Sequence, residues 1–483
     1  MFLCCHFRVC WFVVLSSCFF ISLSMTSAHN EHNNTTLLTS SPPITMAKWI
    51  DSSIGIHSFL TFDSKTTPEN IQHFANKIDY VWGSTEHNVQ HWRQSSNPDV
   101  VLSYYMPFSR DPTPHPTGTP PTSLPWWVDN YPELVLYQCD GITPAWECFA
   151  GEGCSHVSVP LDLTNPETLK YQMNNGVIPA AKAGYNAIAL DNYALNNEWS
   201  ACGSYKGINH SWVQLYDQIN PKKDPQYTLD VLNWTSRACA AIHQIGLLVI
   251  PNYSVMRLNE QTLQVVNVTD GILAEGGFVS WNPIPNTSSY DTLPPLTNPI
   301  KFQEQILFVR HLQRANKGFF AIQEWGPGVD YNLNPSCQPR NLTRTVKQFV
   351  AAAYMMSNGN CSGTFLTCIQ CYGGGCGGVG NFSVWDPEWN AKVGVPLGEP
   401  QMNNDNGVWS RNYSTGLALV NPNNTHDFVF VLPTLKSITI TKSIGQGKND
   451  GDDEVDIWRD VYGKEVGENV TLIAATGMVL LHG

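Results

Sequence analysis

The stretch GYNAIALDN at residues 184–192 decides the fold of this chain, because it joins a helix end to a strand and a polar strand terminus. Gly184 permits the turn that ends a helix, and the apolar run after it is typical of a buried strand. Asp191 and Asn192 follow that run directly. The stretch DGILAE at 270–275 has the same form and ends in Glu275. Both stretches are typical of a parallel sheet whose strand ends carry functional side chains.

Eight short apolar runs alternate with helical stretches from residue 50 onward, which predicts βα units. They lie at 54–60, 79–82, 100–106, 187–191, 247–251, 271–275, 319–323 and 363–368. Helix starts are marked by a capping residue before a proline, as in Thr67-Pro68 and Asn165-Pro166. We therefore predict an α/β fold, a (β/α)8 TIM barrel. A ninth run at 134–138 is a surplus that we place in an insertion after the third strand.

The end of the chain has a different pattern, in which short β-type runs follow one another without helices. This pattern predicts a small all-β sandwich domain. The predicted organisation is a signal peptide at 1–28, a flexible N-terminal segment at 29–49, the barrel at 50–405 and the C-terminal sandwich at 406–483.

The first 28 residues predict secretion. Arg8 is their single formal charge, an apolar run spans 11–23, and small residues at 26–28 suit cleavage. The run is short for about 30 Å of hydrocarbon, which disfavours the alternative of a retained membrane anchor. We expect an extracellular protein without a membrane partner after signal removal. Thirteen glycosylation sequons agree with a secretory route: Asn33, Asn34, Asn209, Asn233, Asn252, Asn267, Asn286, Asn341, Asn360, Asn381, Asn412, Asn423 and Asn469.

Ten of the 14 cysteines follow the signal segment, and an even number in a secreted chain favours disulfide bonds. The four between 361 and 376 form C-x6-C-x2-C-x4-C, which offers a zinc site as the alternative. The second C-x-x-C pair of such a site is missing, and the flanking glycines suit a disulfide-linked loop. The connectivity stays open.

Composition excludes several classes of function. The net charge is −13, which argues against nucleic-acid binding. The 14 histidines are scattered without H-E-x-x-H, and no G-x-S-x-G motif is present, so neither metal hydrolysis nor serine hydrolysis is indicated. We expect no metal, no cofactor and a monomer. With 11% aromatic residues, the chain can bury a large core and also line a binding site with flat rings.

Three strand ends carry a carboxylate directly after an apolar run: Asp191, Glu275 and Glu324. Hydrolysis of a glycosidic bond needs one carboxylic acid to protonate the leaving oxygen and a second carboxylate on the other side of the sugar. Rigid strand ends hold two such groups at the required separation. The alternative for each is a helix cap or an ion-pair partner. Glu324 is either a third residue of the site or a structural one.

Polar and aromatic residues occupy the other strand ends and are candidates for binding substrate. They are His57, Trp82, Tyr104, Asn192, Tyr193, Asn252 and Trp325. Aromatic faces stack on sugars, while Asn, His and Tyr bind hydroxyl groups. Packing in the core is the alternative for each. Asn252 also belongs to a sequon, so either that sequon is unused or Asn252 lies outside the site.

Three segments carry a family resemblance: LDLTNP at 161–166, GYNAIALDN at 184–192 and DGILAEGGF at 270–278. With the C-terminal segments around 411–422, 460–463 and 477–481, they resemble the group catalogued as hypothetical glycosyl hydrolase 15, which is unrelated to glucoamylases. Polygalactosaminidase-like barrels are a more distant comparison. The resemblance implies a barrel followed by a β-domain, with Asp191 and Glu275 as the catalytic pair. The cysteine-rich insertions at 139–154 and 361–376 depart from the family pattern.

Together these observations predict a secreted glycoside hydrolase that acts on an extracellular polysaccharide or glycoconjugate. Asp191 is expected to be the nucleophile or base, and Glu275 the general acid/base with a raised pKa. The alternative function is a non-catalytic carbohydrate-binding or cell-wall protein on the same barrel.

Overall fold

The computed structural model describes residues 59–108, 124–148, 157–278, 299–322, 344–357, 364–367, 391–432 and 457–482, apart from 62, 65, 146, 208, 276, 424, 425, 468 and 473–475. The signal peptide and the flexible N-terminal segment predicted at 1–49 lie outside these residues.

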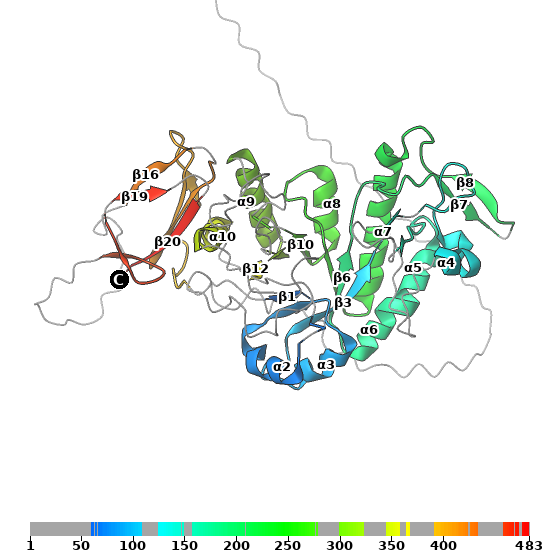
Figure 1. Ribbon diagram of the computed structural model, residues 1–483, viewed down its shortest axis with the longest axis horizontal. Coiled ribbons are helices and arrows are strands. Elements are labelled where there is room, and N and C mark those ends of the chain that lie inside the picture. The colour runs from blue at the N-terminus through cyan, green and yellow to red at the C-terminus, as the bar shows by residue number, and fades with distance from the viewer. Residues whose placement is uncertain are drawn as a thin grey trace, which may run out of the picture. The chain divides into compact units, whose positions relative to one another are not determined.

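Eight parallel strands form a barrel. Figure 1 labels β1, β3, β6, β10 and β12 among them. They are β1 (Phe59–Thr61), β2 (Tyr80–Trp82), β3 (Val101–Pro107), β6 (Ala187–Asp191), β9 (Leu248–Pro251), β10 (Gly271–Glu275), β11 (Gly318–Ile322) and β12 (Thr364–Thr367). Parallel pairing runs from β1 to β9 and from β10 to β12. The bridge between Asn252 and Leu273 joins β9 to β10, and β12 contacts β1. The predicted (β/α)8 barrel is confirmed, and the runs at 187–191 and 271–275 have the predicted bounds.

The alternation of side chains along the strands separates the barrel interior from its outer layer. The interior holds a cluster of ten residues from seven strands: Phe59, Tyr80, Trp82, Val101, Ala187, Ala189, Leu248, Ile250, Leu273 and Phe320. Outward residues such as Leu190 and Ile272 belong to a second cluster that also includes apolar residues of the helices. The interior is therefore a packed core, and the free strand ends are where chemistry can occur.

Helices cover the barrel between successive strands. They are α2 (Pro68–Phe74), α3 (Glu86–Arg93), α5 (Pro166–Gln172) with α6 (Ile178–Ala183), α7 (Pro225–Gln244), α8 (Glu260–Val268), α9 (Pro299–Arg314) and α10 (Arg344–Ser357). The side chains of Thr67 and Asn165 cap α2 and α5, each with a proline at the first helical position. Gly184 ends α6 with φ of 101°. These local signals act as the sequence predicts.

The loops after β3 and β6 together build an insertion with its own core. It includes α4 (Leu124–Asn130), the 3-10 turn η2 (Pro132–Leu134), the pair β4 (Glu147–Cys148) and β5 (Val157–Ser158), and the hairpin β7 (Gly203–Lys206) and β8 (Ser211–Gln214). A disulfide bond joins Cys139 to Cys202. The surplus run at 134–138 lies here, as predicted, and Val135 and Tyr137 belong to an aromatic-rich cluster with Trp127.

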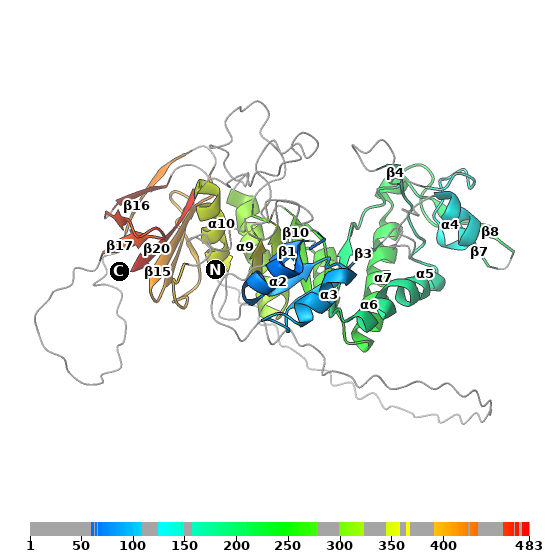
Figure 2. The ribbon, with the colours of Figure 1, turned by 60° about the horizontal axis from the view of Figure 1, so that its bottom comes forward.

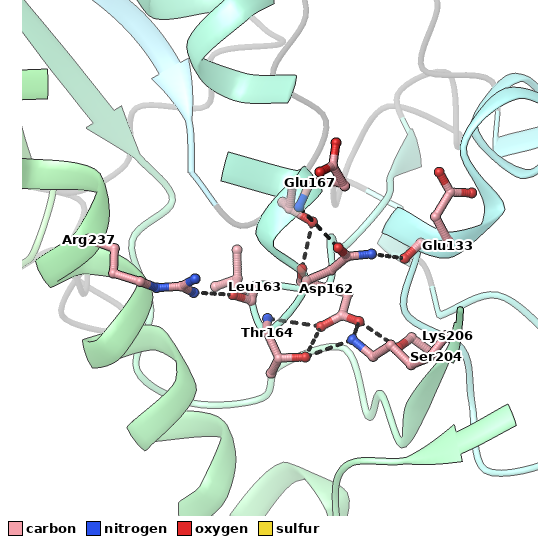
Figure 3. A network of polar contacts seen from close by, with 10 residues as sticks. Glu133, Asp162, Leu163, Thr164, Glu167, Ser204, Lys206 and Arg237 are labelled. Carbon is pink, nitrogen blue, oxygen red and sulfur yellow. Dashed lines mark hydrogen bonds and ion pairs between the residues drawn. The ribbon is translucent and has the colours of Figure 1, made fainter. Parts of the chain in front are cut away.

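Asp162 organises the polar centre of the insertion (Figure 3). Its fully buried carboxylate accepts hydrogen bonds from the backbone N–H and hydroxyl of Thr164 at one oxygen. The other oxygen accepts from the Ser204 hydroxyl at 2.5 Å and pairs with the Lys206 ammonium. Arg237 of α7 donates to the Leu163 carbonyl at 2.9 Å. The loop before α5, the β7–β8 hairpin and α7 are thus tied together.

The C-terminal part consists of two antiparallel sheets around a shared apolar core, as predicted for a sandwich. The larger sheet has the order β13 (Gln401–Met402), β14 (Trp409–Tyr413), β15 (Gly416–Asn421), β20 (Thr476–His482), β17 (Trp458–Asp460) and β18 (Glu465–Val466). The smaller one pairs β16 (Phe428–Val431) with β19 (Asn469–Leu472). The larger sheet begins with β13, upstream of the boundary predicted at 406.

The other face of the larger sheet packs against helix α10, so this sheet is covered on both sides (Figure 2). A Cβ atom at Gly477 would lie 2.9 Å from Ala352 Cβ and from Phe349 Cα, so glycine permits the close approach of β20 to the helix. Arg411 of β14 donates from Nη1 to the Met355 carbonyl at 3.0 Å. The barrel helix and the sheet therefore share one buried surface.

The cysteines only partly follow the prediction of disulfides. Cys139 and Cys202 are bonded, but Cys239 is free and buried in α7. Burial raises the pKa of the Cys239 thiol to about 12. The even count therefore does not mean that every cysteine is paired. The four cysteines at 361–376, with their zinc alternative, lie outside the described residues. No helix in the described ranges is long and apolar enough to cross a membrane.

Candidate active site

Three neighbouring strands bring Asp191, Asn252 and Glu275 to one edge of the barrel. Asp191 ends β6, Asn252 directly follows β9, and Glu275 ends β10. Each lies an even number of residues from an interior residue of its own strand, such as Ala189, so each shares the inward face. All three are half-buried. The predicted pair of carboxylates therefore meets at the mouth of the barrel, with Asn252 between its members.

The Asn252 amide connects the two carboxylates. Its Nδ2 donates to Asp191 Oδ1 at 2.8 Å and to Glu275 Oε1 at 2.7 Å. Because one nitrogen bonds both oxygens, these oxygens can be no more than about 5.5 Å apart. Glycosidases that retain the anomeric configuration have carboxyl groups about 5–5.5 Å apart, whereas inverting enzymes have about 6.5–9.5 Å. This upper limit applies to the two bonded oxygens, and it is compatible with the spacing of retaining enzymes.

Asp191 is held at its second oxygen as well. The Tyr105 hydroxyl donates to Oδ2 at 2.7 Å, and Nδ2 of Asn192 donates to the same atom at 2.8 Å. Asn192 has φ of 55°, a left-handed conformation that asparagine tolerates better than most residues. In that conformation its amide turns back onto the preceding carboxylate. Hydrogen bonds at both oxygens therefore orient Asp191.

The backbone of Glu275 is also positioned by the neighbouring strand. Its N–H donates to the Ser254 hydroxyl oxygen at 3.0 Å. The N–H of Tyr253 donates to the Leu273 carbonyl at 2.8 Å, which extends the pairing of β9 with β10 beyond Pro251. The segment 252–254 therefore serves both carboxylates, since it bridges them at Asn252 and supports Glu275 at Ser254.

The other predicted binding residues divide into three groups. Asn192 and Asn252 contact the carboxylates, and Trp82 lies in the barrel interior. Tyr104 and Tyr193 were predicted to bind substrate, but both lie away from the two carboxylates. Tyr104 is on the outer face of β3 with its ring 5.5 Å from that of Tyr185, because strand alternation turns Tyr105 inward instead.

Tyr193 is buried against the helix layer. Its hydroxyl is 2.8 Å from Thr235 Oγ1 of α7, and its ring packs against Phe108. Burial raises its pKa well above the usual range. The residue that follows Asn192 therefore packs the loop onto α7 and does not face the carboxylates. His57, Glu324 and Trp325 lie outside the described residues.

Sequence reasoning missed two residues of the site, Tyr105 and Ser254. Counting alternation from the interior residue Val101 would have identified Tyr105, because residues 101, 103 and 105 share one face of the strand. Ser254 lies beyond the end of β9, so strand periodicity carried no signal for it.

The position of Asn252 also resolves the sequon question. The nitrogen that would carry a glycan is the same Nδ2 that donates to both carboxylates. A sugar on this atom would displace at least one of those hydrogen bonds and would lie between Asp191 and Glu275. The arrangement therefore requires an unmodified Asn252.

No protein-family model matches the chain, and no curated protein matches it. Solved structures with a similar fold include isomaltulose synthase from Klebsiella sp. LX3, at a TM-score of 0.47 and 9% identity, covering 89% of this chain and 99% of that one. A maltogenic α-amylase from Thermotoga neapolitana has a TM-score of 0.44 and 10% identity, covering 88% and 98%. An α-amylase from Malbranchea cinnamomea has a TM-score of 0.44 and 9% identity, covering 91% and 97%. At these TM-scores and identities, the similarity assigns neither a family nor a function to this chain.

Proposed function

We propose that the chain is a retaining glycoside hydrolase with Asp191 as nucleophile and Glu275 as general acid/base. The observation that carries this proposal is the shared Asn252 amide, whose nitrogen bonds one oxygen of each carboxylate. This keeps the two bonded oxygens within about 5.5 Å of each other, which favours a covalent glycosyl intermediate. The hydrogen bonds from Tyr105 and Asn192 support the role of Asp191, because a nucleophile must be held in a fixed orientation.

The reaction then has two steps. Glu275 donates a proton to the glycosidic oxygen while an Asp191 oxygen attacks the anomeric carbon, so that the C–O bond breaks and a glycosyl ester forms. Glu275, now a carboxylate, removes a proton from water, and the water oxygen displaces Asp191 from the anomeric carbon. Two inversions restore the original configuration.

We further propose that the protein acts outside the cell, on a polysaccharide or glycoconjugate. The composition of residues 1–28 and the density of sequons support this location. The interior cluster below the carboxylates closes the barrel, so substrate must approach from the side where the strands end.

The test compares wild type with Asp191→Asn and Glu275→Gln on a panel of glycans. We expect each variant to lose at least about 10²–10⁴-fold in kcat. NMR of the first product should show the anomer of the substrate. Glu260→Gln is the matched control, since Glu260 is exposed at the start of α8, and it should keep full activity.

Three results would contradict the proposal. Near-full activity in both site variants would remove Asp191 and Glu275 from the mechanism. A first product of opposite configuration would exclude the covalent intermediate. Binding of glycans by wild type without any cleavage would favour a carbohydrate-binding protein on a glycosidase-like barrel.

A further inference from the structure

The outer face of the small β16–β19 sheet is apolar and exposed. Val429 and Val431 are 60% and 68% exposed, whereas Val470 and Leu472 on the opposite face are buried in the core of the sandwich. A sheet that covers a core alternates buried apolar residues with exposed polar ones. Here the exposed positions of β16 are valines instead of polar residues. Exposed β-branched residues beside strand edges promote pairing with other chains.

A glycosylation sequon lies on that same face. In the antiparallel register, Asn469 is opposite Val431 and Thr471 is opposite Val429. Asn469 and Thr471 are both exposed. Directly opposed residues on one face have Cβ atoms about 4.5–5.5 Å apart. A group attached to Asn469 therefore begins beside Val431, on the face that carries both valines.

We propose that Asn469 carries an N-linked glycan that covers the Val429–Val431 face. The glycan comes from a lipid pyrophosphate-linked oligosaccharide in the secretory pathway. Asn469 Nδ2 attacks the anomeric carbon, the bond from that carbon to the pyrophosphate oxygen breaks, and the lipid pyrophosphate leaves with the electron pair. The amide loses one proton to the transferring enzyme. This inference rests on the proposed secretion and is independent of the proposed hydrolysis.

Asn252 and Asn469 differ in what surrounds the amide nitrogen that would carry a glycan. Asn252 uses its amide nitrogen for both carboxylates, so a sugar there would disrupt the site. Asn469 lies on the exposed face of β19, where a bulky hydrophilic group is sterically free and shields apolar surface. Asn252 directly follows β9, and Asn469 is the first residue of β19. Because both sequons lie at a strand end, the local sequence does not show which of them can carry a glycan.

The experiment uses the full chain secreted from cultured animal cells under its own first 28 residues. Peptide mass spectrometry after enzymatic deglycosylation in H2¹⁸O should show Asn469 modified in most copies. The Asn469→Gln variant should self-associate at least about twofold faster than wild type by light scattering. Asn209→Gln is the matched control, since Asn209 is an exposed sequon residue in the turn between β7 and β8, and it should behave as wild type.

A second variant keeps the test decisive if Asn469→Gln is poorly secreted. Adding Val429→Thr and Val431→Thr to it removes the apolar face while keeping β-branched side chains, and should restore secretion and solubility. An unmodified Asn469, with or without glycan at Asn209, would overturn the proposal. So would self-association equal to that of the Asn209→Gln control, or failure of the threonine substitutions to restore the monomer.

Discussion

At Asp191, hydrogen bonds from three side chains orient the carboxylate that we propose as the nucleophile. Tyr105, Asn192 and Asn252 each donate to it, and they come from β3, from the residue after β6 and from the residue after β9. Three different segments must therefore be in register before the carboxylate is oriented. Such support from neighbouring strands is what a preorganised catalytic group requires.

Tyr105→Phe removes the hydroxyl that contacts Asp191 and leaves the ring in place. A hydrogen bond to a charged group contributes about 1.5–3 kcal/mol, so we expect kcat to fall about 10–100-fold with a small change in KM. Steady-state kinetics on a substrate that wild type cleaves measures the effect. Tyr104→Phe is the control on the same strand, and it should retain activity because Tyr104 faces Tyr185. Equal losses in both variants would contradict the assigned role.

Among the elements, the insertion built from the loops after β3 and β6 depends on a buried carboxylate. Asp162 accepts hydrogen bonds from the backbone and hydroxyl of Thr164 and from Ser204, and pairs with Lys206 (Figure 3). Losing one partner of a buried pair leaves the other uncompensated, which costs more than the pair itself contributes. This network holds the β7–β8 hairpin to the loop before α5.

Asp162→Asn should lower the free energy of unfolding by about 2–3 kcal/mol, because the partly exposed Lys206 ammonium loses its partner while polar contacts remain. The midpoint of urea unfolding measures the change. Glu167→Gln is the matched control in the adjacent helix. Its ion pair with Lys170 is exposed, so its loss should cost no more than about 0.5 kcal/mol. A similar midpoint for both variants would show that the buried network does not stabilise the insertion.

At the scale of the whole molecule, the larger C-terminal sheet provides hydrogen-bond donors to backbone carbonyls at the end of the barrel helix α10. Arg411 is buried and donates from Nη1 to the carbonyls of Met355 and Met356 at 3.0 and 3.3 Å, near the end of that helix. Its Nε donates to Gly398 at 2.9 Å. Arg310 of α9 forms an ion pair with Glu399. Burial lowers the pKa of both guanidinium groups. The sheet thus supplies donors that the helix end lacks.

Arg411→Lys should destabilise the protein by about 2–3 kcal/mol, because one ammonium cannot reproduce the planar set of donors that guanidinium offers to three carbonyls. Urea unfolding followed by tryptophan fluorescence measures this change. Arg459→Lys in β17 of the same sheet is the control, since Arg459 pairs with Glu465 at the surface. If Arg411→Lys is as stable as this control, the sheet does not stabilise α10 through Arg411.

The strands were predictable because each is a short apolar run whose period and length depend on local sequence alone. The runs ending at Asp191 and Glu275 have the predicted bounds, and Gly184 and Asn165 end and begin helices as predicted. The prediction that Tyr104 lies in the site missed the correct residue, Tyr105, by one position, because successive side chains of a strand face opposite sides. Cys239 is free and lies on the buried face of α7. An even number of cysteines in the sequence does not reveal which of them is buried in this way.

By itself, the sequence determined the barrel, the following β-domain and the strand ends that carry carboxylates, because periodicity and turn residues act over a few positions. Only the tertiary structure decided that Asn252 stands between Asp191 and Glu275, that Tyr105 replaces Tyr104, and that Asn469 faces an exposed pair of valines. These relations join strands far apart in the chain. The first two depend on the register of the barrel strands around one core, and the third depends on the pairing of β16 with β19 in the C-terminal part.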